Sequence, residues 1–323
     1  MEDAFGRRIN YMRVSITDRC NLRCRYCMPP TGVSLKTHED ILRLEEIVTL
    51  VRVATQVGIT RVRLTGGEPL VRKNVVNLVR ELSKLTALED ISLTTNGLLL
   101  NFLAFPLKEA GLARVNISLD SLREERYRYI TRGGNIKNVW RGIRAALAAE
   151  LNPVKLNVVV MRGFNDDEIL DFARLAYEQP LHIRFIELMP IGTAAAGEIA
   201  YVPVAELRQV IEEHFRLQPI EELRGNGPAR SFRMDGGLGT VGFIGALSEH
   251  FCHRCNRLRL TADGKLRPCL HWGAEIDVKT PLRSGASSEE LLGLFRQAIA
   301  AKPKQHHLEE GWRQVRVMSQ LGG

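Results

Sequence analysis

The feature that most constrains the fold of this 323-residue chain is a regular alternation of short β-branched runs and amphipathic segments. Six runs are typical of strands, at residues 11–17, 61–66, 91–96, 114–120, 154–160 and 182–190. Helical periodicity separates them at residues 44–57, 73–85, 136–149 and 166–177. Strands that alternate with helices favour a parallel sheet. We predict an α/β fold, an incomplete (βα)6 TIM-type barrel, with an open doubly wound sheet as the alternative.

Short polar and glycine-rich motifs lie where these predicted strands end. Cysteines follow the first strand, GGEP the second, TTNG the third, SLD the fourth and ELMP the sixth. Barrel enzymes build their active sites at the carboxyl ends of the strands. The placement of the motifs therefore predicts one site at that end of the barrel.

The alternation is lost after about residue 195, which divides the chain into a partial barrel (1–195) and a C-terminal extension (196–323). Residues 227–245 are typical of short strands and turns, and residues 287–302 of a helix. We expect the extension to close the barrel opening. Gly237, Gly239 and Gly242 form a G-x-G-x-x-G pattern, but a dinucleotide fingerprint should open a helix. Strand-like residues follow here, so we interpret the pattern as a turn.

Composition and charge limit the possible partners. The formal charge of +8 fits either a solvated basic surface or an anionic partner such as a nucleotide or nucleic acid. No apolar run reaches the roughly 18 residues of a membrane span, and the N-terminus lacks a signal-peptide pattern, which favours the cytoplasm. The six cysteines form two groups of three, more than two hundred residues apart. In a reducing compartment such groups indicate metal or cluster binding more than disulfides.

The first group, Cys20, Cys24 and Cys27, has the spacing C-x3-C-x2-C within DRCNLRCRYCMPP. Thiolates bind soft metals and iron–sulfur clusters. A structural zinc ion needs four protein ligands, and this group offers three. Three thiolates on a four-iron cluster leave one iron open for another molecule. Free thiols, or zinc completed by a distant histidine, remain as alternatives.

The second group, Cys252, Cys255 and Cys269, has the spacing C-x2-C-x13-C. It is open to two interpretations: zinc completed by a nearby histidine, or a second cluster with an open iron. The histidines that could complete zinc are His253 and His271. Between the cysteines, NRLRL places two arginines on one side of a short strand, where guanidinium groups suit phosphates.

The first cysteine group, with Tyr26 before its last cysteine, resembles the signature of radical S-adenosylmethionine (SAM) enzymes, and TGGEP at residues 65–69 is similar to their next motif. The resemblance implies that the open iron binds SAM, which is cleaved to a 5′-deoxyadenosyl radical. It also implies four SAM contacts: Tyr26, Gly67, Ser118 and Met189.

Nearly the whole chain, through CNRLRLTADG to the C-terminal RVMSQLGG, resembles the GTP 3′,8-cyclase (MoaA) family of that superfamily, lyases of molybdenum cofactor biosynthesis. The resemblance implies hydrogen abstraction from C3′ of GTP and attack on C8, giving (8S)-3′,8-cyclo-7,8-dihydroguanosine 5′-triphosphate. A second cluster would bind the purine, and the tail Gly322–Gly323, after Arg316 and Met318, would enter the site. The implied GTP contacts are Arg13, Arg63, Thr94, Lys155, Arg257 and Arg259.

The same resemblance implies two [4Fe–4S] clusters and SAM as cofactors, and a homodimer. It implies delivery of product to cyclic pyranopterin monophosphate synthase (MoaC) and reduction by a protein such as flavodoxin or ferredoxin. Neither nucleic acid nor membrane is an expected partner. The alternatives are another radical SAM enzyme with an auxiliary cluster, such as a peptide-modifying one, or a zinc-containing nucleic-acid-binding protein. We interpret the basic segment 126–134 as surface.

Overall fold

The computed structural model describes the whole chain except residues 192–199, 221–226, 272–273, 307–315 and 323. The six predicted strands are present and pair in parallel in chain order. They are β1 (Tyr11–Ser15), β2 (Arg61–Thr65), β3 (Asp90–Thr95), β4 (Arg114–Ser118), β5 (Lys155–Val160) and β6 (His182–Glu187). The predicted incomplete barrel is confirmed.

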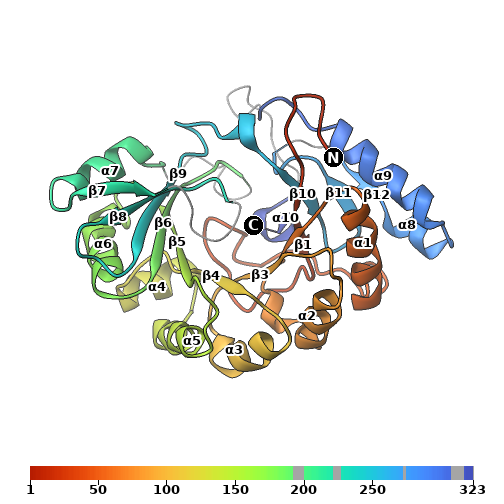
Figure 1. Ribbon diagram of the computed structural model, residues 1–323. Coiled ribbons are helices and arrows are strands. Elements are labelled where there is room, and N and C mark those ends of the chain that lie inside the picture. The colour runs from red at the N-terminus through yellow and green to blue at the C-terminus, as the bar shows by residue number, and fades with distance from the viewer. Residues whose placement is uncertain (192–199, 221–226, 272–273, 307–315, 323) are drawn as a thin grey trace.

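Helices cover the outer face of this curved sheet (Figure 1). They are α1 (Leu44–Gln56), α2 (Val75–Ser83), α3 (Leu100–Glu109), α4 (Glu124–Thr131), α5 (Ile136–Ala148) and α6 (Ile169–Glu178). In α1, for example, Ile47, Leu50, Val51 and Ala54 are buried, the spacing of one helical face. The sequence pattern did not predict α3 or α4. Helix α3 contains Pro106, which is unfavourable inside a helix.

The C-terminal extension adds to both edges of the six-stranded sheet. Strand β9 (Thr240–Ile244) pairs in parallel with β6, and β10 (Arg257–Leu260) pairs in parallel with β1. Within the described residues β9 and β10 do not pair with each other, so the sheet stays open. Antiparallel strands continue each edge: β7 (Leu217–Ile220) and β8 (Arg230–Met234) beyond β9, β11 (Lys265–Arg267) and β12 (Ile276–Asp277) beyond β10.

The helices of the extension take three different positions. Helix α7 (Val204–Glu212) packs near α6, while α8 (Lys279–Arg283) and α9 (Ser288–Ala300) follow β12, with α9 packed on α1. The short α10 (Met318–Leu321) lies in the middle of the curved sheet, beside the C-terminus (Figure 1). The tail is thus brought back to the carboxyl ends of the strands.

The glycine pattern at residues 237–242 forms a turn that leads into β9, as expected. A Cβ at Gly239 would lie 1.9 Å from the carbonyl oxygen of Leu181, so the turn packs too closely for any side chain. Among the described residues, no helix is both long enough and apolar enough to cross a bilayer.

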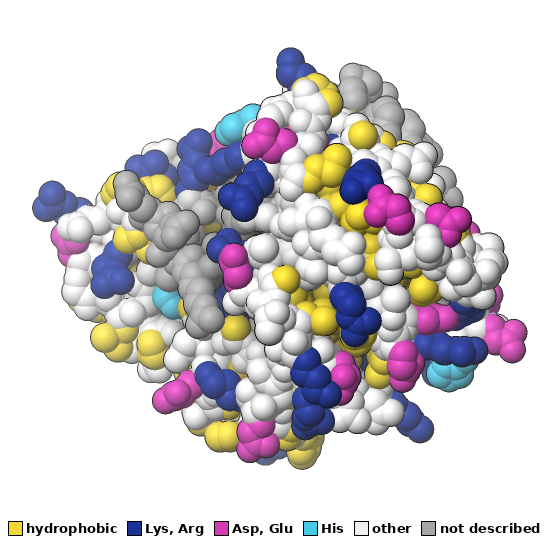
Figure 2. Space-filling model, turned by 45° about the vertical axis from the view of Figure 1, so that its right-hand side comes forward, with side chains coloured by type: hydrophobic (Ala, Val, Ile, Leu, Met, Phe, Trp, Pro, Cys, Tyr) yellow, Lys and Arg dark blue, Asp and Glu magenta, His cyan; other side chains and the backbone are white. Residues whose placement is uncertain are grey.

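The basic surface is not one continuous patch. On the face shown in Figure 2, Lys and Arg side chains are interspersed with Asp and Glu. Surface charges of the described chain also pair with each other, as Arg283 does with Glu46 at 2.7 Å. The more unusual basic side chains lie inside the barrel, where Arg63, Arg114 and Lys155 are buried.

Candidate active site

One cavity of about 330 Å³ runs inside the barrel, and both cysteine groups line it. More than two hundred residues separate the groups in sequence. The first group follows β1, at the carboxyl ends of the parallel strands, whereas Cys252 and Cys255 precede β10, which pairs in parallel with β1, so they lie at the amino end of these strands. All six cysteines are free thiols. The motifs at the carboxyl ends of the strands line this cavity, and its role as an active site stays a prediction.

The TGGEP motif braces the loop that carries the first cysteines. The Gly67 amide donates to the Thr17 carbonyl at 2.8 Å, and the Glu68 amide donates to the Arg19 carbonyl at 2.8 Å. A Cβ on Gly67 would lie 2.3 Å from the Arg19 oxygen. Glycine is therefore required here to let β2 approach the residue next to Cys20.

The basic segment 126–134 holds the other side of this loop, so its interpretation as surface is wrong. Arg132 donates to the carbonyls of Arg23 at 2.7 Å and Met28 at 2.9 Å. The amide of Arg23 donates to the Thr131 carbonyl at 3.2 Å. In α4, Tyr127, Ile130 and Thr131 are buried although most of their neighbours in sequence are charged. The high proportion of charged residues concealed this buried face in the sequence pattern.

Tyr26, a predicted SAM contact, lines the cavity and is fixed by a buried carboxylate. Its hydroxyl donates to Asp120 Oδ2 at 2.8 Å, and the Val159 amide donates to Oδ1 at 2.9 Å. Burial raises the pKa of Asp120 to about 6 against the effect of these two hydrogen bonds. The other predicted SAM contacts, Ser118 and Met189, lie at the ends of β4 and β6 and line the same cavity.

The thiols of each group influence one another. Burial, and then the nearby charge of Cys20, raises the pKa of Cys27 to about 12. In the second group burial opposes ionisation of Cys255, but the charges of Arg257 and Lys302 bring its pKa to about 6. Such groups of mutually close thiols fit a site whose ligands become thiolates on metal binding.

Zinc and an iron–sulfur cluster place different demands on the spacing of their ligands. Among the described residues, no three Cys, His, Asp or Glu side chains converge closely enough to hold one metal ion. Zinc needs its four ligands around a single ion. An iron–sulfur cluster gives each cysteine its own iron, so the thiolates can lie further apart. His271, a candidate zinc ligand, is buried and lines the cavity.

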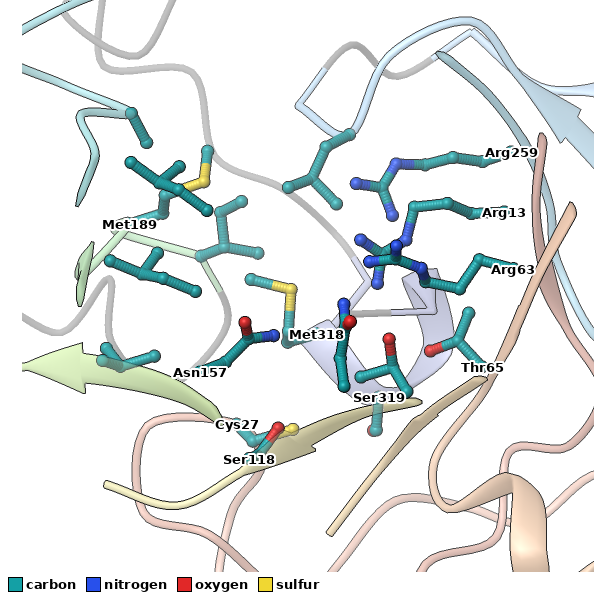
Figure 3. A pocket seen from close by; sticks show the side chains of 18 of the residues that line it. Arg13, Cys27, Arg63, Thr65, Ser118, Asn157, Met189, Arg259, Met318 and Ser319 are labelled. Atoms are coloured by element: carbon teal, nitrogen blue, oxygen red, sulfur yellow. The ribbon is translucent and has the colours of Figure 1, made fainter. Parts of the chain in front are cut away.

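Three arginines on neighbouring strands point into the cavity from one side (Figure 3). Register places Arg259 opposite Arg13 and Arg13 opposite Arg63. Burial, and then the neighbouring positive charges of Arg63 and Arg257, lower the pKa of Arg13 to about 10 despite an opposing effect of Tyr11. Buried cations that repel one another are stabilised by an anion, so this wall is suited to phosphate.

The chain tail reaches this arginine wall. The Gly322 carbonyl accepts hydrogen bonds from Arg13 Nε and Arg259 Nη1, each at 3.2 Å. Upstream, Arg316 pairs with Asp263 at 3.0 Å. Met318 lines the cavity, whereas Gly323 lies outside the described residues.

The remaining predicted GTP contacts differ in their placement. Thr94 and Arg257 line the cavity, but Lys155 does not. Lys155 is fully buried at the start of β5, and burial, followed by the charges of Arg184 and other arginines, lowers its pKa to about 5. The proposed roles of these residues stay predictions.

Sequence reasoning missed several polar residues that line the cavity. They are Asn116 on β4, Asn157 on β5 and Arg184 on β6. Each has a buried polar atom without a hydrogen-bond partner in the described part of the chain. The alternation of side chains along a strand could have indicated such residues, because residues two apart point to the same face. Arg184 and Ile186, two residues apart on β6, both line the cavity.

Comparisons with known proteins agree with this geometry. Residues 14–176 match the Radical SAM superfamily, and residues 181–308 match Molybdenum Cofactor Synthesis C. The chain is 69% identical to a GTP 3′,8-cyclase of Moorella thermoacetica and 57% identical to one of Pelotomaculum thermopropionicum, each over the full length of both chains. Streptococcus suis SuiB bound to S-adenosylmethionine has a similar fold, with a TM-score of 0.58, 15% identity and coverage of 90% of this chain and 68% of SuiB.

Proposed function

Because the chain belongs to the GTP 3′,8-cyclase family of radical SAM enzymes, we propose that this cavity converts GTP to (8S)-3′,8-cyclo-7,8-dihydroguanosine 5′-triphosphate. This is the first step of molybdenum cofactor biosynthesis. The observation that carries the proposal is the meeting of two three-cysteine groups and a row of arginines in one cavity. The cysteine groups alone would not account for binding of the triphosphate of GTP, whereas the row of arginines does.

The chain uses SAM and a [4Fe–4S] cluster, as a member of the radical SAM superfamily. Cys20, Cys24 and Cys27 would hold that cluster, which with SAM supplies the radical that takes the C3′ hydrogen. Tyr26, within the cysteine loop, and Gly67, after β2, would shape the pocket for SAM. The Tyr26 ring is held in place by Asp120, and Gly67 keeps the loop close to β2.

Cys252, Cys255 and Cys269 would hold a further [4Fe–4S] cluster, which would supply a binding point for the purine of GTP. Support comes from the cavity that this group shares with the first cysteine group. With the purine held there and the triphosphate held by the arginines, the ribose would be left for the first cysteine group, where the C3′ hydrogen would be removed.

The arginine wall would bind the triphosphate. Arg13, Arg63 and Arg259 present guanidinium groups from adjacent strands, and charge-assisted hydrogen bonds to phosphate oxygens are strong in a buried site. Thr94 and Arg257 extend this wall in the cavity. Lys155 lies deeper, so its contact with GTP would require a shift of its side chain.

The barrel (1–195) and the extension (196–323) would then form one catalytic unit, because each contributes one cysteine group to the cavity. Family membership further supports a homodimer, reduction by flavodoxin or ferredoxin, and transfer of the product to cyclic pyranopterin monophosphate synthase. The free state of all six cysteines fits a reducing cytoplasm.

An anaerobic assay tests the proposed reaction. The reconstituted protein is given GTP, SAM and dithionite, and the nucleotides are separated by chromatography and identified by mass spectrometry. We expect an isomer of GTP with unchanged mass, together with one 5′-deoxyadenosine for each molecule formed, because one hydrogen is removed and one is returned. Cleavage of SAM with unmodified GTP would contradict the proposal.

A further inference from the structure

The second cysteine group is anchored to a short segment that follows helix α9, at residues 302–304. Helix α9 packs on α1 and on strands β11 and β12, so this segment is attached to the rigid part of the fold. Nothing in the motifs of the sequence singles out these three residues. Lys302 nevertheless contacts the cysteine loop directly, and the carbonyls of Pro303 and Lys304 are connected to it through Arg7.

Lys302 makes contacts on both sides of the cysteine loop. Its side chain is buried, and Nζ donates to the Arg257 carbonyl at 2.7 Å and to the Pro268 carbonyl at 2.8 Å. Nζ also lies 3.9 Å from Cys255 Sγ, a third hydrogen bond. An ammonium group has three donors, and all three are directed at this loop.

The two carbonyls belong to different arms of the loop. Arg257 lies two residues after Cys255, and Pro268 directly precedes Cys269. Lys302 therefore fixes the distance between Cys255 and Cys269. Without Lys302, this distance would depend only on the thirteen intervening residues, which include β10 and β11.

Arg7 secures the remaining cysteine to the same segment. Its Nη1 donates to the Cys252 carbonyl at 2.8 Å and to the Lys304 carbonyl at 3.1 Å, and its Nη2 donates to the Pro303 carbonyl at 2.8 Å. Asp3 holds Arg7 in turn, with Oδ2 at 2.6 Å from Nε. The loop segments that carry the three cysteines are thus hydrogen-bonded to residues 302–304, either directly or through Arg7. Within residues 302–304, Lys302 is the residue that contacts a cysteine sulfur.

We propose that Lys302 is a positioning residue for the second cysteine group, which holds its two arms together and keeps a positive charge beside the Cys255 ligand. The inference rests on the proposed second cluster. A buried cation next to a ligand sulfur stabilises the more negative, reduced form of an iron–sulfur centre. Loss of the charge should therefore make the second cluster harder to reduce.

The test is Lys302→Met, in the full-length protein reconstituted without oxygen. The readouts are iron and acid-labile sulfide per chain, and a redox titration of each cluster followed by electron paramagnetic resonance. We expect the reduction equilibrium of the second cluster to fall about tenfold, which is about 59 mV for one electron. The first cluster should titrate as in the wild type. Selective loss of the second cluster's iron would equally support the positioning role.

Matched variants separate charge from structure. Lys304→Met removes an exposed positive charge two residues away and should leave both titrations unchanged. Lys302→Arg should restore the potential towards the wild-type value. If Lys302→Met fails to fold, Lys302→Gln carries the same test, because an amide keeps two donors but no charge.

Two results would overturn different claims. Wild-type iron content and an unchanged second-cluster potential in Lys302→Met would refute the role of Lys302 alone. A wild-type protein with only about four iron atoms per chain would instead refute the second cluster and the proposed function with it.

Discussion

Substitution of Gly67 by alanine is the sharpest structural test of the TGGEP brace. The new methyl group would meet three backbone atoms of the cysteine loop, at 2.3 Å from the Arg19 oxygen, 2.7 Å from the Arg19 carbonyl carbon and 2.9 Å from the Asp18 oxygen. Ordinary contacts between carbon and its neighbours begin at about 3.5 Å, so the loop must retreat by roughly 1 Å. No flexible side chain is available to absorb that displacement.

The energetic consequence follows from two contributions. Overpacking costs about 1–3 kcal/mol. The displacement also strains the hydrogen bonds from Gly67 to Thr17 and from Glu68 to Arg19, each worth about 1 kcal/mol. We expect a local loss of about 2–5 kcal/mol, concentrated beside Cys20.

The assay combines iron content with SAM cleavage after anaerobic reconstitution. Gly67→Ala should lose most of the first cluster, about four iron atoms per chain, and with it the production of 5′-deoxyadenosine. Gly293→Ala is the matched control, because Gly293 is exposed on α9 and a Cβ there meets nothing within 4 Å. Wild-type iron content and SAM cleavage in Gly67→Ala would refute the bracing role.

Three further predictions address the cavity walls. Arg259→Leu should weaken GTP binding at least tenfold by calorimetry, since a hydrogen bond to a charged group is worth about 1.5–3 kcal/mol; unchanged affinity would exclude it from the phosphate site. Tyr26→Phe removes the donor to Asp120 and should lower the free energy of unfolding by about 1–3 kcal/mol, and an unaltered urea midpoint would contradict this contact. The pKa of Lys155 is lowered from 10.5 to about 5 in the folded protein, so the free energy of unfolding of the wild type should decrease as the pH falls from about 10.5 to about 5. In Lys155→Met the free energy of unfolding, measured with urea at pH 6 and pH 9, should change less with pH than in the wild type. An equal change in both proteins would show that Lys155 is not neutral in the fold.

Local pattern was sufficient for the barrel strands because each is a compact β-branched run, and the motifs at their ends identified the cavity. Helix α4 was hidden by its charge, since EERYRYIT shows few apolar letters while Tyr127 and Ile130 are buried. The edges of the sheet could not be predicted, because the pairing of β10 with β1 joins residues that are far apart in the chain. The periodicity of a strand does not indicate which other strand it pairs with.

The same limit applies to the candidate site. The cysteines and Arg13 were recognisable from spacing and motif, and the structure brings them to one cavity. Lys155 shows the reverse case, because a lysine on an inward strand position can lie beneath a cavity instead of lining it. Lys302 carries no motif, and its importance arises only from tertiary hydrogen bonds to two distant carbonyls.

Transfer of deuterium from GTP is the most direct test of the central claim that both cysteine groups serve one radical reaction on the ribose. The reconstituted protein is incubated with SAM, reductant and GTP that carries deuterium at C3′, and the 5′-deoxyadenosine is analysed by mass spectrometry. The account predicts one deuterium in each 5′-deoxyadenosine molecule and a GTP isomer that has lost it. Unlabelled 5′-deoxyadenosine, formed at the same rate with and without GTP, would contradict it.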